Sequence, residues 1–223
     1  MRTRTPISAK DGAVTILYLA STSPARLMLL RQAGIEPVVI PSHVDERAAE
    51  DAAAAERGAA PTAAETVLLL ARLKAEAVLG PEIDGIVIGS DSAFEFGGHV
   101  YGKPLDAQAA TARWHAQRGG TGVLHSGHWV VDHRGGTANS ATGAVADASV
   151  TFGADMTDAE IDAYVATGEP LGVAGAFTID SLGGAFIDRV EGDPSTVVGL
   201  SLSLTRRLVD ELGVPWSSLW NRT

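Results

Sequence analysis

Apolar runs and helical patterns alternate at the start of the chain. The apolar run 14–20 predicts a strand. It ends at Ser21-Thr22-Ser23-Pro24, where Ser23 can cap a helix that has Pro24 at its first position. The helical pattern runs to Gly34, and residues 37–40 predict a second strand. The chain therefore begins in the order strand, helix, strand.

Residues 48–64 are rich in Ala, Glu and Asp and contain Gly58 and Pro61. This composition leaves two structures open, a mobile loop that could act as a flap and a weak helix. A periodic helix is predicted next, from Ala63 to Leu79, and it ends at Gly80-Pro81.

Strand patterns dominate the rest of the chain. We predict a buried strand at 85–89 and a hairpin over 94–101 that turns at Gly97-Gly98. Further strands are expected at 123–132, 144–152, 174–179 and 185–190, with helices at 107–117, 155–167 and 195–212. Because crossover helices and hairpins occur together, the predicted fold class is α/β, with a mixed twisted sheet covered by helices.

The composition narrows the classes of function. With 223 residues, of which 45% are hydrophobic and 20% charged, the chain is long enough for one sizeable α/β domain or two small lobes. Its 17 Lys and Arg against 27 Asp and Glu give a formal net charge of −10, which argues against general nucleic-acid binding. The chain has no cysteine, so disulfides, thiolate zinc sites and cysteine nucleophiles are excluded.

The first residues do not have the pattern of a targeting segment. Basic residues precede an apolar run, 14–20, that leads straight into a turn. No stretch approaches the roughly 20 apolar residues that a membrane-spanning helix needs. We therefore expect a cytoplasmic protein without a membrane partner. Residues 1–12 are expected to form a loose extension, and residues 13–223 a single domain with two lobes.

Basic residues lie beside turns and helix starts at three separated places. These are Arg26, Lys74 and Lys103. A single lysine or arginine is most often a solvated surface charge. Together, however, such cations could build an anion site, because free backbone N–H groups at these places already favour phosphate.

Acidic residues follow two of the predicted strands. Asp91 comes directly after the buried strand 85–89, where a rigid scaffold commonly carries functional loops. Asp45-Glu46 follows the second strand. Carboxylates that meet across a cleft are ligands that Mg²⁺ or Mn²⁺ prefers. For Asp45-Glu46 a solvated turn is an equal alternative.

Two other patterns are discounted. Residues 97–103 match the P-loop pattern G-x-x-x-x-G-K. However, Pro104 replaces the Ser or Thr that follows the lysine in a P-loop, and the predicted hairpin does not lead into the helix that a P-loop requires. His125 and His128 have an odd spacing on a predicted strand, which sends their side chains to opposite faces and favours structural roles over a shared metal.

The ordered series of short motifs resembles the Maf family of nucleoside triphosphate pyrophosphatases. The resemblance runs from about residue 16 to the C-terminus. Its motifs are Ser21-Thr22-Ser23-Pro24-Ala25-Arg26, Val44-Asp45-Glu46, Lys74-Ala75, Gly89-Ser90-Asp91-Ser92, Gly102-Lys103-Pro104, Thr167-Gly168-Glu169-Pro170, Ala174-Gly175-Ala176-Phe177 and Val198-Gly199-Leu200.

The resemblance implies two lobes around a cleft, as in the inosine triphosphatase architecture, a homodimer and a divalent cation, Mg²⁺ or Mn²⁺. The implied reaction hydrolyses a nucleoside triphosphate to the monophosphate and pyrophosphate. Asp91 falls on the family's proton acceptor, and with Glu46 it would hold the metal. The residues on the family's phosphate site are Ser21, Arg26, Lys74 and Lys103.

The three specificity positions of the family differ here. Members that act on dTTP and UTP carry Arg, Thr and Gln, whereas this chain has Ala25, Ser92 and Asp180. Asp180 can only accept hydrogen bonds, so it would favour a base edge that presents N–H. The substrate is thus left open between dTTP or UTP and modified nucleotides. A catalytically weak nucleotide-binding regulator of cell division, and a phosphohydrolase that releases orthophosphate, are the alternatives.

Overall fold

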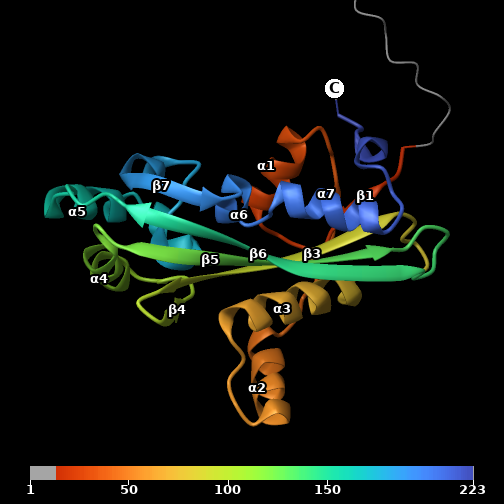
Figure 1. Cartoon of the computed structure of the whole chain (residues 1–223), viewed down its shortest axis with the longest axis horizontal. Helices are drawn as coiled ribbons and strands as arrows, with labels where there is room; N and C mark the ends of the chain where they lie inside the picture. Colours follow the sequence, from red (N-terminus) through yellow and green to blue (C-terminus); the bar gives the residue numbers. More distant parts are fainter. Residues whose placement is uncertain (1–13, 223) are drawn as a thin grey trace, which may run out of the picture.

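Seven strands form one mixed sheet in the computed structural model, which describes residues 14–222. The sheet order is β2-β1-β3-β5-β6-β7, with β4 paired to β3 (Figure 1). β1 is parallel to β2 and β3, and the other pairs are antiparallel. The strands are β1 Leu17–Leu19, β2 Val38–Val39, β3 Ile86–Phe96, β4 His99–Tyr101, β5 Thr121–Asp132, β6 Ser140–Phe152 and β7 Ile187–Gly192.

Helices cover both faces of this sheet, as the sequence predicts. In Figure 1, α1, α6 and α7 lie on one face, α3 lies on the other with α2 projecting beyond it, and α4 and α5 lie at one end. The helices are α1 Pro24–Gln32, α2 Glu46–Arg57, α3 Ala63–Ala77, α4 Ala107–Gln117, α5 Asp158–Ala166, α6 Pro194–Val198 and α7 Leu202–Glu211. Short 3₁₀ helices occur at Glu169–Gly172, Ala174–Ala176, Leu182–Phe186 and Trp216–Leu219.

Helix α3 lies directly against the sheet. It begins with a capping box, in which Thr62 accepts from the backbone of Glu65 and the Glu65 carboxylate accepts from that of Thr62. A Cβ atom at Gly89 on β3 would lie 2.0 Å from the carbonyl oxygen of Ala71 on this helix. One at Gly127 on β5 would lie 2.2 Å from that of Val67. Glycine at both places therefore lets the helix backbone approach the strands closely.

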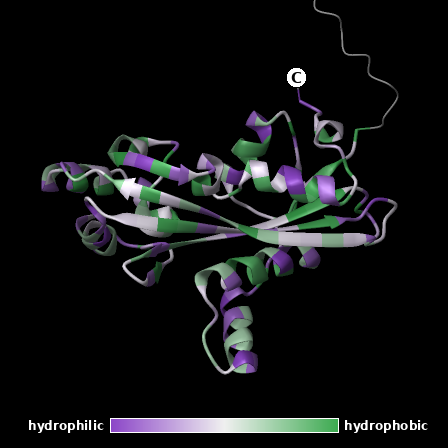
Figure 2. Cartoon of the chain, in the orientation of Figure 1, coloured by the Kyte–Doolittle hydropathy of each residue, from purple (hydrophilic) through white to green (hydrophobic). Residues whose placement is uncertain are grey.

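Buried side chains of the described residues gather along the whole length of the sheet, where Figure 2 shows long hydrophobic stretches on the strands. One cluster packs β1 and β3 against α1 and α7 and includes Leu19, Ile88 and Leu208. A second, aromatic cluster includes Phe94 and Trp114, at the end of the sheet covered by α4 and α5. A third lies under α3. Because β3 and β5 contribute to all three clusters, one continuous sheet carries every part of the core.

Two predicted elements are wrong. The expected strand 174–179 is instead a 3₁₀ helix followed by a loop, because Gly175 and Ala176 have φ of 73° and 63°, which an extended strand does not allow. The expected helix 195–212 is divided into α6 and α7. The break is at Gly199, whose φ of 116° lies outside the helical region.

The segment 48–64, for which two structures were open, is largely helical. It belongs to α2, which Asp45 caps by accepting from the backbone of Ala48, and the helix ends before Gly58. None of the residues of α2 is buried. The predicted loose extension 1–12 lies outside the described residues. Among residues 14–222, no helix combines the length and apolar character that crossing a bilayer requires.

Candidate active site

Nine site residues singled out from the sequence line one cleft of about 1320 Å³, whereas Asp45 caps α2 and does not line it. The cleft lies between the loop after β1, helices α2 and α3, strand β3, the segment after β4 and residues 172–180. The residues that it brings together are Ser21, Ala25, Arg26, Glu46, Lys74, Asp91, Ser92, Lys103 and Asp180. The cleft thus joins segments that are far apart in the sequence.

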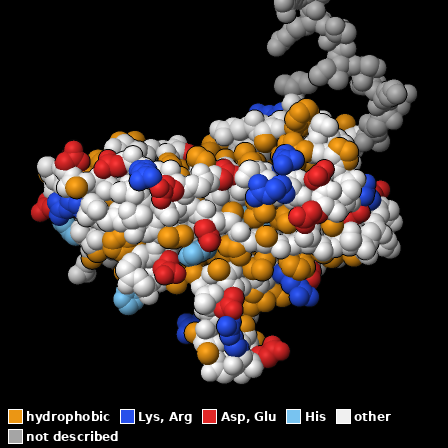
Figure 3. Space-filling model, viewed as in Figure 1, with side chains coloured by type: hydrophobic (Ala, Val, Ile, Leu, Met, Phe, Trp, Pro, Cys, Tyr) orange, Lys and Arg blue, Asp and Glu red, His pale blue; other side chains and the backbone are white. Residues whose placement is uncertain are grey.

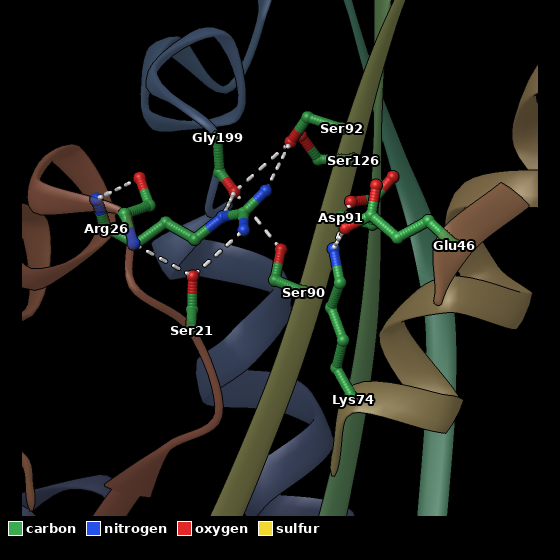
Figure 4. A network of polar contacts seen from close by, with 10 residues as sticks. Ser21, Arg26, Glu46, Lys74, Ser90, Asp91, Ser92, Ser126 and Gly199 are labelled. Carbon is green, nitrogen blue, oxygen red and sulfur yellow. Dashed lines mark hydrogen bonds and ion pairs between the residues drawn. The ribbon is translucent and has the colours of Figure 1, made fainter. Parts of the chain in front are cut away.

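Asp91 does not lie in a loop at the end of a strand, as the sequence suggested. Strand β3 continues through Ser90, Asp91 and Ser92 to Phe96, because it pairs with β5 along this whole stretch. Successive side chains on a strand point to opposite faces. Asp91 therefore faces α3, whereas Ser90 and Ser92 face the side that carries Arg26 and Gly199 (Figure 4).

A lysine between two carboxylates forms the α3 side of the site. Lys74 Nζ lies 2.6 Å from Asp91 Oδ1 and 2.6 Å from Glu46 Oε1 (Figure 4). The side chains of Lys74 and Asp91 are only 11% and 16% exposed, whereas that of Glu46 is 52% exposed. Lys74 reaches Asp91 because the two glycines under α3 hold this helix close to β3. The Lys74–Asp91 pair is thus the shielded part of the cluster, where charge interactions are strongest.

A third carboxylate lies near this cluster. Glu50 is one turn beyond Glu46 on α2 and lines the cleft. Burial raises the pKa of Glu50, and the negative charges of Asp91, Glu46 and Asp51 raise it further. Negative charge is therefore concentrated here beyond what Lys74 balances.

This concentration of carboxylates fits a divalent cation. Oxygen ligands suit Mg²⁺ or Mn²⁺, and a cation would reduce the repulsion among Asp91, Glu46 and Glu50, which adds to the effect of burial on the pKa of Glu50. Within residues 14–222, no three His, Asp or Glu side chains are already arranged to hold a metal ion. Asp91 and Glu46 are the residues that could hold such a cation, with its remaining ligands coming from outside the chain.

Arg26 forms the opposite side of the site. Its Nε donates to the carbonyl oxygen of Gly199 at 2.8 Å, Nη1 donates to Ser21 Oγ at 3.2 Å, and Nη2 donates to Ser92 Oγ at 3.1 Å (Figure 4). Burial lowers the pKa of Arg26, and the charges of Asp91 and Glu46 oppose this shift. Three of the five guanidinium N–H groups are thus directed by the protein, which leaves two for an anion.

Ser21 and Ser92 are among the predicted site residues and Gly199 lies in one of the motifs, but the sequence does not indicate that the Gly199 carbonyl orients Arg26. The Gly199 carbonyl also accepts from Ser90 Oγ at 3.1 Å. The loop that carries Gly199 is tied by Asp193, which caps α6 and accepts from the hydroxyls of Ser201 and Ser203, both at 2.7 Å. These bonds lower the pKa of the Asp193 carboxyl although its burial alone would raise it. An Asp-Pro-Ser sequence indicates a helix cap. It does not indicate that the capped loop supports a side chain far away in the sequence.

The comparisons with known proteins give one family. The sequence profile described as Maf-like protein matches residues 16–212. This chain belongs to the Maf family. Over 92% of its length the chain is 67% identical to a protein of Leifsonia xyli, 54% identical to one of Salinispora tropica and 52% identical to one of Streptomyces coelicolor. The matches cover 97%, 88% and 94% of those proteins, each of which is named nucleoside triphosphate pyrophosphatase.

The three residues at the family's specificity positions, as the resemblance places them, have unlike surroundings. Ser92 is already engaged, because its hydroxyl contacts Arg26 and also lies 2.9 Å from Ser126 Oγ. Ala25 lies in the first turn of α1 and offers no polar group. Asp180 is exposed on the segment 177–181 that lines the far side of the cleft. Of the three, Asp180 is the one that brings an exposed carboxylate to the cleft.

The two histidines lie on opposite faces of β5, as predicted. His125 Nδ1 lies 2.8 Å from Asp147 Oδ1. His128 is fully buried, and its Nε2 accepts from the backbone N–H of Ser201 at 2.8 Å. Burial and the charge of Arg26 lower the pKa of His128 to about 4. His128 is therefore neutral in the folded protein and helps to fix the loop that carries Gly199.

Proposed function

We propose that this chain hydrolyses a nucleoside triphosphate to the monophosphate and pyrophosphate. The observation that carries the proposal is the cleft itself, where Arg26, Lys74 and Lys103 surround one space with Asp91 and Glu46. The name shared by the relatives, nucleoside triphosphate pyrophosphatase, supports the same activity.

The fixed cations account for binding and for stabilisation of the transition state. A triphosphate carries several negative charges, and attack at phosphorus concentrates charge on the equatorial oxygens. Arg26 presents N–H groups that are already oriented by Gly199, Ser21 and Ser92, so little reorganisation is needed during the reaction. Lys103, which is exposed on the segment after β4, would bind the outer phosphates.

Asp91 is the proposed proton acceptor. Lys74 engages Oδ1, so we assign Oδ2 to the attacking water. As the water oxygen bonds to the α-phosphorus, its proton passes to Asp91 Oδ2, the bond from that phosphorus to the bridging oxygen breaks, and pyrophosphate leaves. Lys74 holds the carboxylate in place during this transfer.

The proposal includes a divalent cation, Mg²⁺ or Mn²⁺, that Asp91 and Glu46 would hold. When bound, it would neutralise phosphate charge and lower the pKa of a coordinated water. The homodimer and the cytoplasmic location, implied by the resemblance and expected from the sequence, complete the proposal. Light scattering of the purified protein tests the first, and cell fractionation tests the second.

The deciding experiment separates the possible products. The purified protein is incubated with a panel of nucleoside triphosphates and Mg²⁺ or Mn²⁺ in water labelled with heavy oxygen, and the products are resolved by mass spectrometry. We expect pyrophosphate, with the label in the monophosphate. Release of orthophosphate would support a phosphohydrolase instead, and binding without turnover would support a nucleotide-binding regulator.

Asp91→Asn tests the assigned base. An amide cannot take the proton, so we expect turnover to fall at least about 100-fold, in the range typical of general-base catalysis. Nucleotide affinity should change much less. Turnover within about threefold of the wild-type protein would contradict the role of Asp91, whereas loss of the folded state would show in the thermal unfolding midpoint measured alongside.

A further inference from the structure

Glu169 is the centre of a hydrogen-bond cluster that the proposed reaction does not use. It follows α5 and lies beside the segment Thr178–Gly183, which carries Asp180. Its Oε1 accepts from Tyr164 Oη at 2.9 Å, from Thr178 Oγ1 and from Gly183 N at 3.0 Å. Its Oε2 accepts from Ser181 Oγ at 2.7 Å and from Leu182 N at 3.3 Å.

These five hydrogen bonds all come from neutral groups. Although burial alone would raise the pKa of Glu169, the bonds from Thr178, Ser181, Gly183 and Tyr164 lower it to about 2. The carboxylate is therefore ionised throughout the neutral range. A short loop that is built around a negative charge depends on that charge for its shape, because its donors would otherwise lose their common acceptor.

The geometry of the loop connects Glu169 to the cleft. Glu169 binds the loop at its two ends, through Thr178 and Gly183, and again at Ser181, next to Asp180. The ends also lie close together, since a Cβ atom at Gly183 would be 2.6 Å from the Thr178 carbonyl oxygen. Thr178 and Asp180 line the cleft, whereas Glu169 does not. Glu169 thus contacts the loop that carries Asp180 from outside the cleft.

We infer that Glu169 is a positioning residue for base selectivity, which fixes Asp180 where it accepts a hydrogen bond from a ring N–H of the base. This inference rests on the proposed function. Uracil, thymine and guanine present a ring N–H, whereas cytosine and adenine present an unprotonated ring nitrogen at the corresponding edge, which a carboxylate repels. Selectivity between these two groups of bases therefore depends on how firmly Asp180 is held.

Glu169→Gln is the sharpest substitution. Its amide oxygen can keep the three donors of the Oε1 side, but its NH₂ group then faces the donors of Ser181 and Leu182. The loop is thus released next to Asp180 while the rest of the cluster is retained. Ser181→Ala, which removes one donor to Oε2, is a milder variant that should act in the same direction.

The measured quantity is a ratio of dissociation constants. Calorimetry with non-hydrolysable α,β-methylene triphosphates compares uracil with cytosine and guanine with adenine, so the result does not require turnover. A hydrogen bond to a charged group changes affinity about tenfold or more. We expect Glu169→Gln to reduce the preference for uracil and guanine by about tenfold, and Asp180→Asn to reduce it similarly. The double variant should lose no more than Asp180→Asn alone.

The matched control is Glu160→Gln. Glu160 also accepts from a backbone N–H and a hydroxyl, both of Thr157, but in the capping box of α5 outside the cleft. The Glu160→Gln variant should lower the midpoint of thermal unfolding and leave the ratio of dissociation constants between bases unchanged. If Glu169 had only a structural role, its substitution would weaken the binding of all nucleotides equally. Ratios of dissociation constants within about twofold of wild type in both Glu169→Gln and Ser181→Ala would overturn the inference. Failure of the wild-type protein to release pyrophosphate would instead refute the proposed function, and the binding ratios would still test Glu169.

Discussion

The buried His128 makes folding stability depend on pH in a calculable way. Its Nε2 accepts from Ser201 N, which only the neutral ring can do, and the positive charge of Arg26 opposes protonation. The pKa of His128 falls from 6.5 to about 4 on folding. The unfolded chain therefore binds more protons than the folded protein between these values. The stabilising effect is complete above the unfolded pKa and is lost as the pH falls toward the folded pKa.

The magnitude follows from the size of that shift. One pKa unit corresponds to about 1.4 kcal/mol. A shift from 6.5 to about 4 therefore removes about 3 kcal/mol from the free energy of unfolding by pH 4. This loss is a substantial part of the total for a domain of ordinary stability, which is about 5–15 kcal/mol.

The assay compares the wild-type protein with His128→Gln. Glutamine keeps an accepting oxygen for Ser201 N but does not titrate. Urea unfolding is measured for both proteins at intervals from neutral pH down to pH 4, the folded pKa of His128. Carboxylates are common to both, so their effects cancel in the difference. We expect the difference in unfolding free energy, wild type minus variant, to fall by about 3 kcal/mol on acidification. A difference that stays constant within about 0.5 kcal/mol would refute a neutral, buried His128.

Two further substitutions test how the site is built. In Gly89→Ala the new Cβ would lie 2.0 Å from the Ala71 carbonyl oxygen, so α3 must move away from β3. We expect the free energy of unfolding, measured in urea, to fall by about 1–3 kcal/mol. We also expect a lower kcat/KM, because Lys74 moves with the helix. Wild-type values of both would show that the close approach is not needed. In Arg26→Lys one ammonium cannot replace three directed N–H groups, and we expect kcat/KM to fall about 100-fold in steady-state assays. A decrease of less than about threefold would show that charge alone suffices.

The sequence was sufficient to predict element boundaries where neighbouring residues determine them. Helix α1 begins at Pro24 after the Ser23 cap, and α4 spans Ala107–Gln117 as predicted, with Asp106 as its cap. The hairpin of β3 and β4 pairs Phe96 with His99 around the predicted turn. Caps and tight turns are determined by adjacent residues, so these boundaries can be predicted without tertiary contacts.

Prediction failed where distant contacts decide the backbone. At 174–179 the apolar pattern suggested a strand, but a Cβ at Gly175 would lie 2.7 Å from the Phe94 ring, and the chain turns there to pack on that ring. Similarly, the carbonyl of Gly199 that orients Arg26 is 173 residues away along the chain. A backbone acceptor carries no signal in residue identity. The resemblance therefore suggested Arg26, Ser21 and Ser92 as site residues, but it could not reveal that the Gly199 carbonyl orients Arg26.

Charged side chains of both signs occur on the surface. On the face shown in Figure 3, acidic and basic side chains are interspersed rather than gathered into one basic patch. The formal net charge of −10 therefore acts on a mixed surface, which does not favour a polyanionic partner on this face.

The continuous sheet has a consequence for how the enzyme would accommodate a nucleotide. Strands β3, β5 and β6 pass without interruption from the cluster around Leu19 and Ile88 to the aromatic cluster around Phe94 and Trp114. The two ends of such a sheet cannot swing about a flexible linker, since any relative rotation must twist hydrogen-bonded backbone. We therefore expect helix α2, rather than the sheet, to move when ligands of different size bind, because none of its residues is buried.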